Sequence, residues 1–402
     1  MHVSLEYIAL GILIIVFLVA TMYVIQNTMS KLNQVYEEQL YPVTQRILDK
    51  ILLTTGYPAD WGDNLTAIPE DFGLALNGTR TSYVVDDAKV MRLTNFSTIA
   101  NPAYINASTI AELLGVEGKY GFRLEIKPFL NQTMDVLATY PVPNRKTPDI
   151  PVYILVTVKN WYNIGVPNAN VTAQLVLVRI NFWPNGSVKD LNYTTFTRSN
   201  VTGPLGTCTV DFRDDLADYF SAPGLGAGGA YRVYSFVTLY TNWSGFLVLS
   251  AIPTQALVDA PVSGYLIGDY VVINRTLSVI GAVRIRNASL QVIPSTFSVL
   301  QVANITWLDT TSPPFGLLRP WQDYLVGKVE GLDPYAAYLL IFATWRGYPI
   351  IITVSRVPNV DLWYGQPGAL PPNSVTLTRV VQIGLYPYLV RLTVWRLAEG
   401  YP

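Results

Sequence analysis

Residues 7–25, YIALGILIIVFLVATMYVI, form an unbroken apolar stretch of 19 residues without a charge. A helix rises 1.5 Å per residue, so this length spans a hydrocarbon core of roughly 30 Å. A cleaved secretory signal is the alternative, but its apolar core is about 7–15 residues long and ends at a small-residue cleavage site. Here Gln26 and Asn27 follow instead. The sequence therefore predicts a retained transmembrane helix.

The predicted helix continues past the membrane as a stalk. Pro42 lies inside it and should introduce a kink, while Gly56 and Pro58 give a stop signal. We therefore expect one transmembrane and stalk helix over 1–56. Its apolar stripe must be buried either against the head of the same chain or against copies of the helix. The stripe consists of Met29, Leu32, Tyr36, Leu40, Val43, Ile47 and Ile51.

Composition excludes several classes of function. The chain has 402 residues, half of them hydrophobic but only 14% charged, and a net charge of −1, which argues against nucleic-acid binding. The single histidine, His2, and the single cysteine, Cys208, cannot supply a Ser–His or Cys–His catalytic set, the usual zinc ligands or an intramolecular disulfide. We expect no catalytic residue, no cofactor and no metal, and a buried Cys208 within a strand.

Asparagines in N-x-S/T sequons are unusually frequent, which predicts N-glycosylation. All of them follow the apolar stretch, so we expect the body of the protein outside the cell and the N-terminus inside. The thirteen predicted acceptors are Asn64, Asn77, Asn95, Asn106, Asn131, Asn170, Asn185, Asn192, Asn200, Asn242, Asn274, Asn287 and Asn304.

The rest of the chain predicts a mainly β protein. We expect a small mixed α/β module over 57–140, and then a proline-rich linker. Short alternating stretches divided by Gly, Pro and Asn predict an immunoglobulin-like β-sandwich over 148–252. The same pattern continues to the end and predicts a second, β-sandwich-like domain over 253–402.

Three features of the sequence are candidate sites of chemistry. Gly224–Gly229 matches a dinucleotide-binding glycine pattern, but a strand-like stretch follows it, which favours a hairpin loop. The nine Trp and 26 Tyr either form a sugar-binding face or fill the core. An acidic cluster is either a calcium site or a solvated loop, and its spacing favours the loop. The cluster consists of Asp211, Asp214, Asp215 and Asp218.

The N-terminal pattern resembles type IV pilin-like subunits, including those of archaea. Ser4-Leu-Glu6 precedes an apolar helix, an amphipathic extension and a β-rich head. In that family a glutamate near the mature N-terminus lies in the filament core, and Glu6 is the matching residue. Residues 51–62 and 72–75, with Lys89, resemble a module that follows such helices in archaeal surface proteins. Residues 165–173 resemble a strand-turn signature of immunoglobulin-like repeats in bacterial and archaeal surface adhesins.

These observations predict a glycosylated cell-surface structural protein, either a pilin-like filament subunit or a filament-associated adhesin, and not an enzyme. The alternative is a monomeric, membrane-anchored binding or receptor protein of the cell envelope. The expected partners are the membrane and further copies of the chain, both through the helix, with surface glycans as a further candidate.

Overall fold

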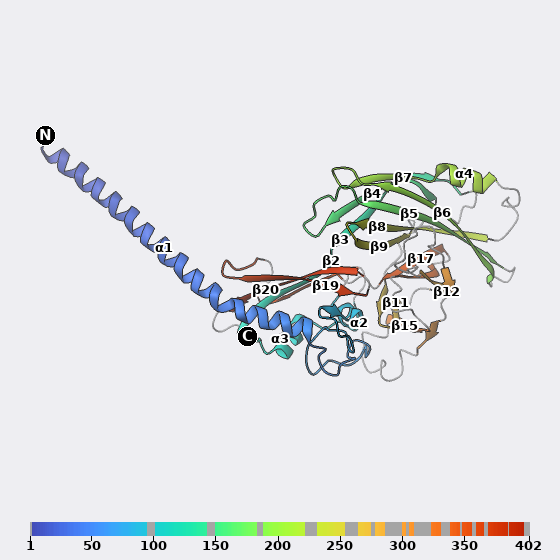
Figure 1. Cartoon of the computed structure of the whole chain (residues 1–402), viewed down its shortest axis with the longest axis horizontal. Coiled ribbons are helices and arrows are strands. Elements are labelled where there is room, and N and C mark those ends of the chain that lie inside the picture. The colour runs from blue at the N-terminus through green and yellow to red at the C-terminus, as the bar shows by residue number, and fades with distance from the viewer. Residues whose placement is uncertain are drawn as a thin grey trace.

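The structure is a computed structural model of the chain. It describes residues 2–94, 101–142, 149–182, 188–221, 231–253, 264–274, 278–285, 300–302, 305–308, 323–330, 338–345, 348–355, 359–365, 369–384 and 386–397. Within the N-terminal helix, side chains are described over 13–28 and 39–53. The molecule is mainly β, as the sequence predicted, with several sheets at one end and a helix extending away from them (Figure 1).

Helix α1 spans His2–Leu53. Its last four turns lie against strands β19 (Val375–Ile383) and β20 (Tyr386–Arg396), where Leu48 and Ile51 are fully buried. The helix ends because the following chain folds back and satisfies its terminal carbonyls. The N–H of Leu74 donates to the carbonyl of Ile51 at 2.7 Å, and that of Ala75 to the carbonyl of Thr54 at 2.9 Å.

The sheet beneath α1 has five strands in the order β1-β19-β20-β2-β18. Strands β1 (Val84–Val85), β2 (Tyr120–Pro128) and β18 (Val360–Tyr364) complete it, and all pairs are antiparallel except β1 with β19. Side chains from alternate positions of β2 and β20 share one hydrophobic core with α1. The predicted division between 57–140 and 253–402 therefore needs correction, because β2 pairs with β18 and β20 in one sheet. We call this unit the head.

Two short helices connect β1 to β2. Helix α2 (Asp87–Met91) begins at Asp86, whose side chain accepts a hydrogen bond from the N–H of Lys89. Helix α3 (Ala107–Leu114) begins in the same way at Asn106. It ends at Gly115, which adopts a left-handed conformation (φ 68°) that glycine tolerates without strain. Both helices pack beside the end of α1 (Figure 1).

A β-sandwich follows β2 directly. One sheet contains β3 (Leu130–Tyr140), β4 (Ile150–Asn160) and β7 (Thr207–Asp211). The other has the order β6-β5-β8-β9, formed by Val188–Val201, Asn170–Phe182, Tyr231–Trp243 and Phe246–Pro253. Helix α4 (Arg213–Ser221) follows β7. The sandwich thus begins near residue 130 rather than 148, and the predicted proline-rich linker lies between two paired strands.

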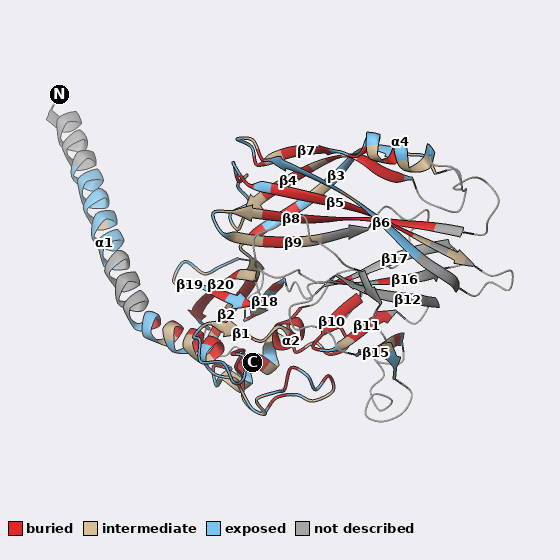
Figure 2. Cartoon of the chain, turned by 45° about the vertical axis from the view of Figure 1, so that its right-hand side comes forward, coloured by how far each residue is buried: buried red, intermediate tan, exposed pale blue. Residues whose placement is uncertain are grey.

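The central strands β5 and β8 of the four-stranded sheet are buried on both faces. Val171, Ala173 and Leu175 face the sandwich core, while Val176 and Phe236, on the outer face, are also buried. Strand β17 (Tyr348–Ser355) lies against β8 and β9 on that outer side (Figure 2). A sheet covered on both faces loses the alternation of apolar and polar residues that marks a half-exposed strand.

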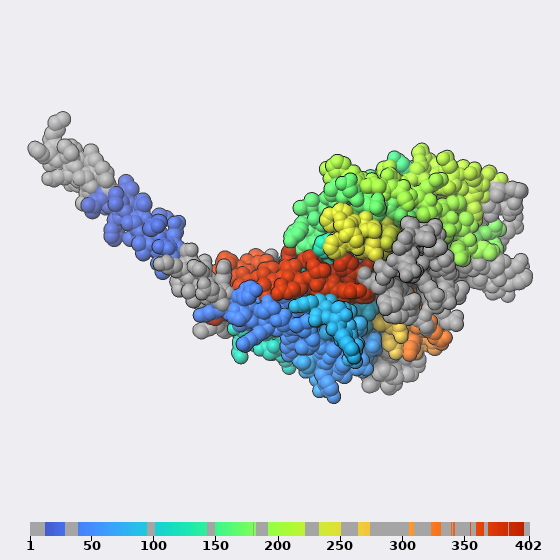
Figure 3. Space-filling model, viewed as in Figure 1, coloured from blue at the N-terminus to red at the C-terminus, as the bar shows by residue number. Residues whose placement is uncertain are grey.

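Two more four-stranded sheets, β13-β12-β16-β17 and β10-β11-β15-β14, lie between the sandwich and the helix α2 side of the head (Figure 2). The predicted domain 253–402 is therefore divided, since its last strands return to the head (Figure 3). The strands are Gly264–Ile267, Tyr270–Asn274, Ser278–Ile285, Leu300–Val302, Ile305–Trp307, Tyr324–Val329, Tyr338–Trp345 and Tyr348–Ser355 for β10 to β17 in order.

Candidate assembly site

Residues 13–25 of α1 form an apolar surface that no other described part of the chain covers (Figure 3). Phe17 is 68% exposed and Tyr23 is 69% exposed. The hydroxyls of Thr21 and Thr28 donate to the carbonyls of Phe17 at 2.9 Å and Val24 at 2.8 Å within the same helix. Because these hydroxyls already have partners, this surface suits lipid or the apolar side of another helix better than water.

The lower part of the stalk stripe is buried against the head of the same chain. Leu40, Ile47 and Ile51 are buried there, and Val43 packs against the same core. The upper members, Met29, Leu32 and Tyr36, lie outside the described side chains, as does Glu6. Within the residues that the structure describes, no helix is both long enough and apolar enough to cross a membrane.

The end of α1 is held by a compact polar and aromatic unit, residues 54–76 together with Lys89 and Arg92, which we call the helix socket. At its centre, the fully buried Trp61 lies 6.0 Å from the ring of Phe72 and donates through Nε1 to the carbonyl of Gly73 at 3.1 Å. Gly73 has no room for a side chain, because a Cβ there would lie 2.3 Å from the carbonyl oxygen of Thr54. The socket contains residues 54–62, 72–75 and Lys89 of the stretch that resembles the archaeal module.

Arg92 stabilises the socket through hydrogen bonds to backbone carbonyls. Its guanidinium is buried and donates to the carbonyls of Ala103 (3.2 Å), Trp61 (2.6 Å), Asn64 (2.8 Å) and Ala67 (2.6 Å). It also lies 5.4 Å from the centre of the Trp61 ring. Burial lowers the pKa of Arg92 to about 10. The carbonyls of residues 61, 64, 67 and 103 therefore all accept hydrogen bonds from one guanidinium group.

Lys89 has a similar position beside Asp86. The ammonium group is fully buried and donates to the carbonyls of Thr55 (2.9 Å) and Ala75 (3.0 Å). It lies 3.9 Å from the Asp86 carboxylate. Burial lowers the pKa of Lys89 and raises that of Asp86 to about 6, an effect that the positive charge of Lys89 only partly offsets. Neither Lys89 nor Arg92 was predicted from the sequence to lie in a buried site.

Asp86 should make stability depend on pH. Its folded pKa of about 6 lies above its ordinary value of 3.8, so the folded state binds the proton more tightly. The associated stability is complete below pH 3.8 and is lost as the pH rises through about 6. Asn at this position keeps the N-cap acceptor but does not titrate. Unfolding free energies measured from pH 4 to 7 should therefore fall by roughly 2–3 kcal/mol more for the natural chain than for Asp86→Asn. Parallel curves would contradict this.

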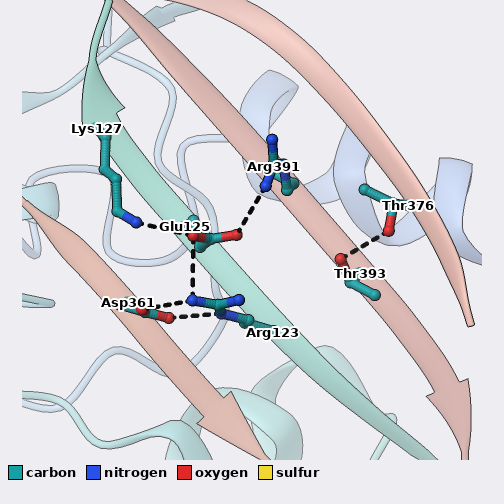
Figure 4. A network of polar contacts seen from close by, with 7 residues as sticks. All are labelled: Arg123, Glu125, Lys127, Asp361, Thr376, Arg391 and Thr393. Carbon is teal, nitrogen blue, oxygen red and sulfur yellow. Dashed lines mark hydrogen bonds and ion pairs between the residues drawn. The ribbon is translucent and has the colours of Figure 1, made fainter. Parts of the chain in front are cut away.

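A second polar cluster covers the outer face of the five-stranded sheet (Figure 4). The buried Glu125 carboxylate lies 2.8 Å from Lys127, 3.2 Å from Arg123 and 3.6 Å from Arg391. Arg123 also binds Asp361 through two hydrogen bonds of 2.8 and 2.7 Å. These residues come from β2, β18 and β20, and cross-strand register places them together, since Glu125 lies opposite both Asp361 and Arg391.

The predicted glycosylation acceptors with described side chains all lie at the surface. Asn242 is half-buried, and the other seven are exposed: Asn64, Asn77, Asn106, Asn131, Asn170, Asn192 and Asn200. In Asn64, Asn106 and Asn242 the side-chain oxygen accepts a hydrogen bond from a nearby backbone N–H group. A glycan would be attached to the side-chain nitrogen, so these hydrogen bonds are compatible with glycosylation. The side chains of Asn95, Asn185, Asn274, Asn287 and Asn304 lie outside the description.

The remaining candidate motifs show no common site. Cys208 is buried in β7, as predicted, and burial raises its pKa. Of the acidic cluster, Asp211 pairs with Arg213, and Asp215 pairs with Arg198 at 2.9 Å. Asp214, Asp215 and Asp218 belong to α4 rather than to the predicted loop. Within the part of the chain that the structure describes, no three His, Cys, Asp or Glu side chains come together as a metal site requires. Gly224–Gly229 lies outside that part.

Comparison with known proteins identifies no family. No family model matches this chain, and no curated protein matches it. Among solved structures, the crystal structure of red sea bream transglutaminase is 12% identical and aligns over 61% of this chain and 32% of the transglutaminase chain. Its TM-score is 0.12, so the likeness carries no argument about fold or activity.

Proposed function

We propose that this protein is a structural subunit of the cell surface that is held in a membrane or a filament by α1 and displays its β-rich head outside. The observation that carries the proposal is the division of α1 into two parts. Residues 13–25 expose apolar side chains, whereas Ile47, Leu48, Ile51 and Leu52 belong to the buried core of the head. An exposed apolar helix of this kind is costly in water and must be covered by lipid or by copies of itself.

The helix socket supports a firm attachment of α1 to the head. The N–H groups of Leu74 and Ala75 donate to carbonyls at the end of α1, and Lys89 donates to the carbonyl of Thr55 directly after it. Arg396 and Arg379 of the neighbouring strands also donate to Gln39 (2.8 Å) and Gln45 (3.2 Å) on α1. A pilin-like filament subunit needs this kind of rigid connection between its assembly helix and its displayed head.

The sandwich supports a display or adhesin role. Its first, second and fifth strands form one sheet, and its fourth, third, sixth and seventh form the other. An immunoglobulin constant-type domain differs only in carrying its fourth strand in the first sheet. The favoured function is therefore a pilin-like subunit or filament-associated adhesin with an immunoglobulin-like domain.

Exposure of the described sequon acceptors supports N-glycosylation of the head. Protein isolated from its native source should show added glycan mass on several of the thirteen asparagines, because exposed acceptors lie within reach of the transferring enzyme. Asn200 should be less readily modified, since its side-chain nitrogen donates a hydrogen bond to the carbonyl of Thr209 at 2.8 Å. Intact-mass analysis followed by peptide mapping measures this. An unmodified mass would contradict both the glycosylation and the external location of the head.

The anchor is tested by placing charges in the exposed apolar segment. We expect Ile14→Lys combined with Leu18→Lys to remove the chain from the carbonate-washed membrane fraction and from sheared surface material. Each lysine near the centre of a membrane helix costs about 2.5–3.5 kcal/mol, and both positions are half or more exposed in this chain. The matched control is Ile14→Leu with Leu18→Ile, which keeps the surface apolar. Normal retention of the lysine variant would overturn the proposal.

The alternative is a monomeric membrane-anchored receptor. The burial of Leu40, Ile47 and Ile51 against the chain's own head favours it, because that part of the stripe does not need a second copy. The two functions share the anchor and differ in self-association.

A further inference from the structure

The outer face of the five-stranded sheet carries a row of three cations between two indole rings. Arg123, Lys127 and Arg391 have side chains that are 22%, 34% and 28% exposed. At one end of the row, the Arg123 guanidinium lies 4.5 Å from the centre of the Trp363 ring. At the other end, Trp161 lies 5.1 Å from Arg391 and 5.4 Å from Lys127. We call these five residues the cation row.

The two indoles come from different parts of the fold. Trp363 belongs to β18 of the head, whereas Trp161 directly follows β4 of the sandwich. The sandwich is fixed beside the row at Phe129, which stacks on Phe246 at 4.3 Å and donates its N–H to the carbonyl of Pro387 at 3.1 Å. The cation row therefore lies where the two units meet, which is a preferred location for ligand sites.

The charges of the row are pre-arranged and not fully balanced. Glu125 lies beneath the three cations and Asp361 beside Arg123, so three positive charges face two negative ones (Figure 4). The contact between Arg391 and Glu125 is the longest, at 3.6 Å. Arg391 thus keeps a partly exposed guanidinium that can donate to a second, incoming anion without leaving Glu125 unpaired.

We propose that the cation row binds acidic saccharides, with sugar carboxylates on Arg391 and Lys127 and the apolar faces of neighbouring sugar rings on Trp161 and Trp363. The proposal rests on the external location of the head under the proposed function. Planar indoles offer apolar area at low entropic cost, and guanidinium groups match carboxylates in geometry and charge. A neutral saccharide would use only the rings and leave the excess charge unmatched.

The test uses the full chain in detergent micelles and isothermal titration with hexagalacturonate, with neutral maltohexaose as the comparison. We expect hexagalacturonate to bind, to bind more weakly as salt rises, and to bind at least tenfold more tightly than maltohexaose. Arg391→Gln should weaken binding by about tenfold or more, while Arg391→Lys should retain most of it. Arg198→Gln is the matched control, since Arg198 is also a strand arginine paired with one carboxylate, Asp215.

Equal binding of the neutral sugar, no binding at low salt, or an equal loss in Arg198→Gln would each overturn the assignment. Thermal denaturation of each variant shows whether the head is intact, and Lys127→Gln replaces Arg391→Gln if that variant unfolds. Membrane retention of the same variants separates the two proposals. If the natural chain is retained in the membrane but does not bind hexagalacturonate, the saccharide site is refuted and the proposed anchoring function is not.

Discussion

Replacing Arg92 by methionine should lower the free energy of unfolding by about 4–6 kcal/mol. The methionine fills similar space but leaves the carbonyls of Trp61, Asn64, Ala67 and Ala103 without the donor that they share. Each unsatisfied buried carbonyl costs about 1–3 kcal/mol. Four such groups would cost about 4–12 kcal/mol together. Relief of the desolvation of the guanidinium, and access of water to the part-buried carbonyls of Asn64 and Ala67, offset part of that sum, so we expect about 4–6 kcal/mol. A domain stability of about 5–15 kcal/mol makes this loss severe.

The measurement is urea denaturation of the full chain followed by tryptophan fluorescence, to which Trp61 contributes next to the substitution. Arg92→Lys should be intermediate, because one ammonium group cannot reach four carbonyls. The control is Arg46→Met, an exposed arginine of α1, for which we expect a change of at most about 0.5 kcal/mol. A loss below 1 kcal/mol for Arg92→Met would show that water replaces the guanidinium and that the socket is not fastened in this way.

The strands were easier to predict than their partners. Residues 120–127 alternate apolar and polar side chains, a pattern that indicates a strand, and β2 is found there. Alternation records which side chains face the core but not which edge pairs with which neighbour. The pairing of β2 with β18 and β20, more than 200 residues away, therefore had no local signal, and the predicted domain boundaries followed chain order instead.

Strand β3 was missed because a polar residue interrupts its inward pattern. Gln132 is buried, and its amide donates to the carbonyl of Leu239 and the hydroxyl of Ser250, both at 2.8 Å, while its oxygen accepts from Thr241 at 2.7 Å. A glutamine satisfied on all sides belongs to the core, but the sequence alone presents it as a surface residue.

The socket was missed for a related reason. The partners of Lys89 and Arg92 are backbone carbonyls, which every residue carries, so no complementary residue type marks the site. The available signal was the position of the two cations in the apolar run Ala88–Leu93, next to Asp86 and Asp87. Buried cations are rare unless paired, and two in one short apolar run indicate a site where backbone groups converge.

The substitution Glu6→Gln should leave the chain in the membrane but abolish its assembly with other copies into filaments. An ionised carboxylate at the edge of the apolar stretch 7–25 is costly unless it is paired or reaches the interface. In a pilin-like assembly Glu6 is buried among packed helices, where a neighbour's N-terminal amine is its partner. Removal of one member of a buried pair typically costs about 3–5 kcal/mol. In a monomeric anchor Glu6 reaches water, and the same substitution is almost neutral.

Electron microscopy of sheared surface material, together with fractionation of the membrane, distinguishes these outcomes. Glu38→Gln is the control, because it removes the same charge from the polar part of α1 and should alter neither readout. Retention in the membrane with assemblies lost supports the filament subunit. Unchanged assemblies in Glu6→Gln would contradict a buried pair at this position. If neither the natural chain nor the variant forms assemblies, the monomeric receptor is favoured. The exposed apolar surface over residues 13–25 would then be covered by lipid alone.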